Sequence, residues 1–167
     1  TLLRNWFFVQ TAAINPNARG VAFDDEVMGR LIRFVSSHEV GHTLGLPHNM
    51  GSSVAYPVDS LRSASFTKKY GTAPSIMDYA RFNYIAQPGD EGVALMPDIG
   101  VYDKYAIQWG YKPILHKTAE EEKAILDEWI LEHAGDPLYR FGHQQVGDIV
   151  DPSSQTEDLG DDAVKAS

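Results

Sequence analysis

Three histidines and one glutamate lie close together in HEVGHTLGLPH, residues 38–48. His38 and His42 are four residues apart, so on a helix they project from the same face, where both imidazoles can reach one metal ion. Glu39 lies about 100° further round the helix, where its carboxylate would meet a water on that ion rather than the ion itself. This arrangement indicates a general base beside a hydrolytic metal centre.

The residues after His42 explain how a third ligand can reach the same ion. Gly45 can adopt the left-handed conformation that ends a helix, and Pro47 prevents the helix from resuming. His48 can then approach the ion from below. Three protein ligands and an open fourth position are typical of catalytic zinc, so we expect Zn²⁺ as the cofactor. A chance match to all five fixed positions has a probability on the order of 10⁻⁵ in a chain of this length.

A long helix must carry this motif. Apolar residues from Val27 to Val35 recur at steps of three and four, with Asp24 or Asp25 as the N-cap, which predicts about five helical turns running into the motif. The aromatic and branched segment Leu2–Ala12 favours a strand. We also expect helices at three later segments, which are Ser60–Tyr70 closed by Gly71, Val101–Trp109, and Thr118–Ala134 with a capping box at Thr118 and Glu121 and a stop at Gly135.

Composition narrows the class of protein. The chain has 167 residues, 43% of them hydrophobic, which suits one domain with a real core. Its formal net charge of -9 argues against nucleic acid as a partner. It has no cysteine, so a metal must be bound through nitrogen and oxygen. We expect no membrane span and interpret the chain as a piece of a longer protein, whose other domains are expected partners.

HEVGHTLGLPH fits HExxHxxGxxH and resembles the zinc signature of the metzincin metallopeptidases. SIMDY, residues 75–79, is similar to the methionine-containing turn that lies beneath the zinc in that family. The resemblance implies that Met77 is the structural residue of this turn and that Tyr79 stabilises the transition-state oxyanion. Residues 100–111, GVYDKYAIQWGY, are similar to the helix that follows the turn. The resemblance implies a peptidase of protein or peptide substrates.

Nearly the whole chain is similar to large zinc-dependent metalloproteases of gut and environmental bacteria, which implies a location in the cell envelope or outside the cell. Only 37 residues precede His38, too few for the sheet that metzincins place before this helix. We therefore expect one α+β, mainly helical domain over residues 1–167, with the upper β-sheet largely missing. Residues 1–48 would form a partial upper subdomain with the zinc helix, and residues 49–167 a lower subdomain with the Met-turn.

Three functions are compatible with these residues. The leading hypothesis is a zinc endopeptidase with Glu39 as general base. The alternatives are a non-catalytic, zinc-containing module of a larger envelope protein, and a hydrolase of non-peptide amides or esters. Asn49 and Asp78 flank the motif elements and could orient a ligand from outside it. The other histidines are interpreted as surface or capping residues, namely His116, His133 and His143.

Overall fold

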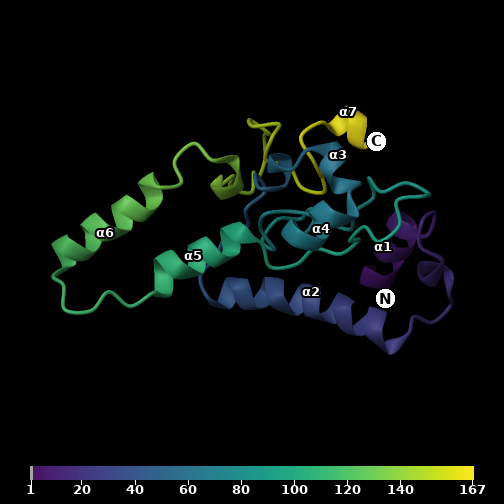
Figure 1. Cartoon of the computed structure of the whole chain (residues 1–167), viewed down its shortest axis with the longest axis horizontal. Helices are drawn as coiled ribbons and strands as arrows, with labels where there is room; N and C mark the ends of the chain where they lie inside the picture. The colour runs from purple at the N-terminus through teal and green to yellow at the C-terminus, as the bar shows by residue number, and fades with distance from the viewer. Residues whose placement is uncertain (1) are drawn as a thin grey trace.

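The computed structural model describes residues 2–167, which form helices joined by long loops (Figure 1). An isolated antiparallel bridge joins Asn49 to His143, and residues 2–167 contain no β-sheet. The prediction of a mainly helical chain is confirmed, whereas its β component is not found in this part of the chain. The helices are α1 (Leu2–Thr11), η1 (Pro16–Arg19), α2 (Asp25–Thr43), η2 (Ser53–Ala55), α3 (Val58–Leu61), α4 (Ala64–Tyr70), α5 (Val101–Tyr111), α6 (Ala119–Leu131), η3 (Pro137–Tyr139) and α7 (Ala163–Ala166).

The strand prediction for residues 2–12 is wrong, because this segment is helix α1. Phe7 and Thr11, four residues apart, are its buried residues, and this spacing belongs to one face of a helix. Phe8 and Val9, whose types favoured a strand, are 49% and 75% exposed. Burial of Phe7 against the rings of Phe23 and Phe82 therefore outweighed the local strand preference.

Helix α2 has the length and ends that the sequence predicted. The Asp24 side chain caps it by accepting a hydrogen bond from the Val27 backbone N–H at 2.8 Å. The helix runs for 19 residues and ends at Thr43. Gly45 follows with a φ of +85°, the left-handed conformation that turns the chain back. The buried residues of α2 are Leu31, Phe34, His38 and Gly41, so the side of the helix that carries them faces the rest of the molecule.

Two apolar clusters hold the loops in place. The first joins α1 and α2 to the loops at residues 76–82 and 96, through Phe7, Leu31, Phe34, Met77 and Phe82 among others. The second lies around α3 and includes Leu159 and Ala166 from the end of the chain. The first cluster spans the predicted boundary between residues 1–48 and 49–167, and that division itself stays a prediction.

Helices α5 and α6 extend together from one end of the molecule (Figure 1). The Thr118 and Glu121 capping box begins α6 as predicted, and Gly135 beyond its end has a φ of +84°. No residue of helix α6 is buried, and the ammonium of Lys112, the residue that follows α5, lies 4.8 Å from the centroid of the Trp129 ring. None of the helices described is both long and apolar enough to cross a membrane.

Candidate metal centre

The three motif histidines converge on one point. Nε2 of His48 lies 3.1 Å from Nε2 of His42 and 3.2 Å from Nε2 of His38. Their ligand atoms all lie within 4.8 Å of one another. His38 is a buried residue of α2, while His42 and His48 are more accessible. The sequence prediction that Gly45 turns His48 back toward the α2 pair is confirmed.

Each imidazole is fixed by an oxygen on its other nitrogen. Nδ1 of His38 bonds to the carbonyl of Ile76 at 2.8 Å, and Nδ1 of His42 bonds to the carbonyl of Leu46 at 2.9 Å. Because a carbonyl oxygen only accepts, Nδ1 must carry the proton in both rings, and in the neutral form of each ring Nε2 then carries the lone pair. Burial lowers the pKa of His38, which further favours its neutral, ligating form.

This donor set fits one cation. Nitrogen lone pairs that face one another at 3.1–3.2 Å repel unless a positive charge lies between them. Three nitrogens bound tetrahedrally at about 2.1 Å from zinc are about 3.4 Å apart, and the two separations from Nε2 of His48 are close to this value. Three imidazole ligands suit zinc better than calcium or magnesium, which prefer oxygen.

The Met77 turn packs directly beneath the helix that carries His38 and His42. Met77 is fully buried, and its backbone carbonyl accepts a hydrogen bond from the N–H of Asn49, the residue after His48. A Cβ added to Gly41 would lie 2.3 Å from the Met77 sulfur, so only glycine allows this approach. The turn therefore contacts the chain at α2 and again just beyond the third histidine.

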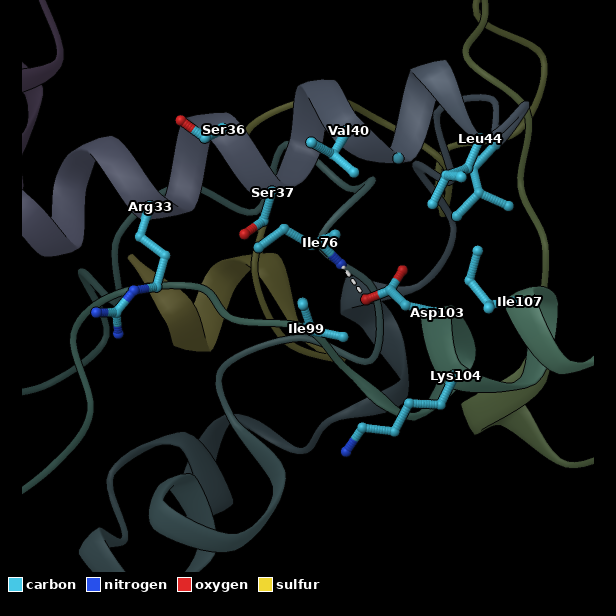
Figure 2. A pocket seen from close by; sticks show the side chains of 12 residues that line it. Arg33, Ser36, Ser37, Val40, Leu44, Ile76, Ile99, Asp103, Lys104 and Ile107 are labelled. Carbon is cyan, nitrogen blue, oxygen red and sulfur yellow. Dashed lines mark hydrogen bonds between the residues drawn. The ribbon is translucent and has the colours of Figure 1, made fainter.

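A buried carboxylate, which sequence reasoning did not identify, holds this turn. Asp103 of α5 accepts hydrogen bonds from the Ser75 hydroxyl at 2.6 Å, the Ile76 N–H at 2.8 Å and the Gly100 N–H at 2.7 Å. The bond to Ile76 is the dashed line in Figure 2. Since the Ile76 carbonyl in turn accepts from His38, Asp103 orients a motif histidine through the backbone of one residue, Ile76. Its signal was an acidic residue in the first turn of a predicted helix, which is too common to be specific.

The two residues expected to act on substrate lie beside the triad. Glu39 is exposed on α2, next in sequence to His38. The Tyr79 ring lies 4.6 Å from the His48 ring and 5.4 Å from the His38 ring, between centroids. Behind Tyr79, the guanidinium of Arg81 lies 4.8 Å from its ring centroid. The positions suit the expected roles of Glu39 and Tyr79, and those roles stay predictions.

The comparisons with known proteins agree with this geometry. A family model described as Met-zincin matches residues 20–167. The chain belongs to the Met-zincins. Met-zincins are zinc-dependent metallopeptidases whose metal is bound by a histidine triad, which His38, His42 and His48 form here. No curated protein and no solved structure matches the chain.

The third histidine of the Met-zincin triad is oriented from far along the chain. The side-chain oxygen of Gln144 lies 2.7 Å from Nδ1 of His48, although the two residues are 96 positions apart. Asn49 fixes the segment that carries Gln144, since its amide binds the Arg140 carbonyl and the Gly142 N–H. No periodicity or motif marks Gln144, so it could not be identified from sequence.

Replacing Gln144 by alanine should weaken zinc binding about 10- to 100-fold, because His48 loses the acceptor that fixes its tautomer and ring orientation. A competitive titration with a chromophoric zinc chelator measures this affinity. Gln144→Glu is the matched control, since it keeps an oxygen acceptor for Nδ1 of His48 and should therefore bind zinc about as tightly as the natural chain. Equal affinity in the alanine variant and the natural chain would contradict the role.

The other polar residues considered in the sequence, Asp78 and His133, make their contacts away from the histidine triad. Asp78 accepts hydrogen bonds from the Ser52 hydroxyl and the Ser53 N–H, and burial raises its pKa to about 7. His133 stacks on the Tyr139 ring at 3.7 Å between centroids. The side chains of Asp78 and Asn49 therefore support the loops around the metal centre, and these hydrogen bonds do not involve a motif histidine.

Proposed function

We propose that this chain hydrolyses peptide bonds as an endopeptidase, with zinc at the triad and Glu39 as general base. The convergence of three Nε2 atoms beside an exposed carboxylate carries the proposal. The open side of the triad supports it, because His42 and His48 are accessible while His38 is anchored from below. Family membership supports a protein or peptide as the substrate.

Zinc, Glu39 and Tyr79 have separate roles in the proposed hydrolysis. Zinc, when bound, lowers the pKa of water to about 7 and polarises a carbonyl. Glu39 takes a proton from the attacking water as the water oxygen bonds to the carbonyl carbon. It then passes that proton to the leaving amine as the C–N bond breaks. Tyr79 donates its phenolic hydrogen to the negative charge that develops on the carbonyl oxygen.

Tyr79→Phe should lower kcat on the order of 100-fold with little change in KM, because the lost hydrogen bond forms mainly in the transition state. The phenylalanine ring keeps the packing against His48, so zinc content should be unchanged. Steady-state cleavage of a quenched fluorescent peptide, with zinc measured on the same sample, tests both points. An unchanged kcat would remove Tyr79 from the mechanism.

Zinc removal tests the proposed function as a whole. Protein stripped with 1,10-phenanthroline should lose cleavage of an unfolded protein substrate and should melt at a lower temperature, since zinc binds the folded state. One equivalent of Zn²⁺ should restore both. Cleavage that survives stripping would overturn the proposal.

The same experiment separates the other functions. Protein that binds one equivalent of zinc, gains thermal stability and cleaves no peptide would instead support the non-catalytic module. Hydrolysis of esters or small amides alone would support the remaining alternative, a hydrolase of non-peptide substrates. The expected location in the cell envelope or outside the cell stays a prediction, which fractionation of the source cells would test.

A further inference from the structure

An apolar groove runs between α2 and α5. It has a volume of about 410 Å³, and its floor and walls include Val40, Leu44, Ile76, Ile99 and Ile107. In Figure 2, these side chains face the space between the two helices. Val40 and Ile99 are 53% and 51% exposed, so the groove leaves a large apolar surface in contact with water.

The groove is separate from the metal centre. Arg33, Ser37 and Val40 of α2 and Leu44 at its C-cap line the groove. At 100° per residue, these side chains centre about 150° around the helix from His38 and His42. The backbone of α2 at Gly41, with Met77 packed against it, stands between the two sites. A ligand in the groove would therefore leave the triad accessible.

The groove continues into a basic hollow. Arg33 and Lys104 line the groove and, with Arg30, Lys68 and Lys69, surround the two adjoining hollows. Figure 2 shows Arg33 descending from α2 and Lys104 extending from α5 along the same side. Two acidic side chains lie along this surface. Asp98 lines the two adjoining hollows, and Asp103 lines the groove, where it is buried and accepts hydrogen bonds from Ser75, Ile76 and Gly100.

These cations lack ion-pair partners in the part of the chain that the structure describes, whereas Arg62, Arg81, Arg140 and Lys165 all pair with carboxylates. The contrast is strong because the chain as a whole carries a net charge of -9. Five unpaired cations gathered beside an apolar groove create a local positive field in an acidic protein.

We propose that this surface binds an extended peptide segment in which one or two large apolar side chains adjoin a run of acidic residues. The apolar side chains would occupy the groove between Val40, Leu44 and Ile107, and the carboxylates would pair with Arg33, Lys104 and the cations beyond them. The volume suits two leucine-sized side chains. A role in holding a substrate away from the bond that is cleaved rests on the proposed function, but the binding itself does not.

Both parts of the surface are needed to recognise this partner. The apolar groove supplies affinity through the area removed from water. The cations supply orientation and exclude basic segments, because like charges there would be brought together. An apolar peptide without carboxylates would leave the cations unpaired, and an acidic peptide without apolar residues would leave the groove empty.

Fluorescence anisotropy of the zinc-loaded full chain tests the proposal. The probe is a fluorescein-labelled peptide with two leucines followed by four aspartates. One comparison peptide replaces the aspartates by lysines, and another replaces the leucines by alanines. The probe should bind saturably and at least about tenfold more tightly than either comparison peptide, and raising the salt concentration should weaken it.

Variants assign the binding to the groove. Arg33→Glu with Lys104→Glu, and separately Val40→Asp, should each weaken the probe about tenfold or more. Lys117→Glu with Lys123→Glu makes the same charge change outside the groove and should leave binding unchanged. Glu39→Gln should also bind the probe normally, so that loss of peptidase activity and loss of this interaction can be distinguished.

Three outcomes would overturn the proposal. The first is absence of saturable binding by a chain whose circular dichroism and melting temperature are normal. The second is equal weakening by the control pair, which would show that the interaction follows net charge alone. The third is a dimer in sedimentation that Val40→Asp dissociates, which would assign the groove to a second copy of the chain.

Discussion

Glu39→Gln is expected to slow peptide hydrolysis by about 10²- to 10⁴-fold, because glutamine cannot take the proton of the attacking water. Glutamine has nearly the same size, and Glu39 is exposed on α2, so the change should leave the fold intact. The three histidines keep their anchors to Ile76, Leu46 and Gln144. Zinc content should therefore stay at that of the natural chain while kcat falls.

The measurement pairs peptide cleavage with metal analysis of the same preparation. Glu39→Asp is a graded control, since it keeps the carboxylate but withdraws it by one methylene, and should retain more activity than Glu39→Gln. Activity of Glu39→Gln within tenfold of the natural chain would contradict the general-base assignment. A parallel loss of zinc would show that Glu39 supports the metal rather than the proton transfer.

Asp103→Ala is expected to lower the free energy of unfolding by on the order of 3–5 kcal/mol, a large part of the stability of a typical domain. The change leaves the Ser75 hydroxyl and the N–H groups of Ile76 and Gly100 without their acceptor in a buried place. The Ile76 carbonyl that anchors His38 would then lose its fixed position. Zinc affinity should fall together with stability in denaturant and chelator titrations.

Asp103→Asn is the matched control. Its amide oxygen can accept from both backbone N–H groups while its nitrogen donates to the Ser75 hydroxyl, so most of the loss should be avoided. Burial raises the pKa of Asp103 above its ordinary range. A raised pKa in the folded state means that stability declines as the pH rises through it. The asparagine variant should lack this decline, and equal stability of the alanine and asparagine variants would contradict the network.

Local chemistry made the central part of the metal centre predictable. The four-residue spacing of His38 and His42, the cap at Asp24 and the turn at Gly45 depend on residues within a few positions of one another. Each was predicted from sequence and is confirmed in the structure. The turn at Met77 was found by resemblance to a family rather than by physical pattern.

The supports of the site could not be predicted, because they depend on how distant segments pack. Asp103 acts through the turn at residues 75–77, and Gln144 reaches His48 from a loop with no regular pattern. Helix α1 was predicted as a strand because residue type was given more weight than the spacing of Phe7 and Thr11. In each case a tertiary contact decided what a short window of sequence left open.

The bond between His48 and Gln144 joins the metal centre to the last quarter of the chain. Binding free energies are reciprocal, so whatever factor the ordered 140–155 segment adds to zinc affinity, zinc must add to the ordering of that segment. A partner, a modification or a proteolytic cut near Arg140 or Asp151, which hold this loop together, would therefore act as an effector of the metal centre. The hydrogen bond thus provides a thermodynamic coupling through which the loop at residues 140–155 can set how much zinc the histidine triad retains.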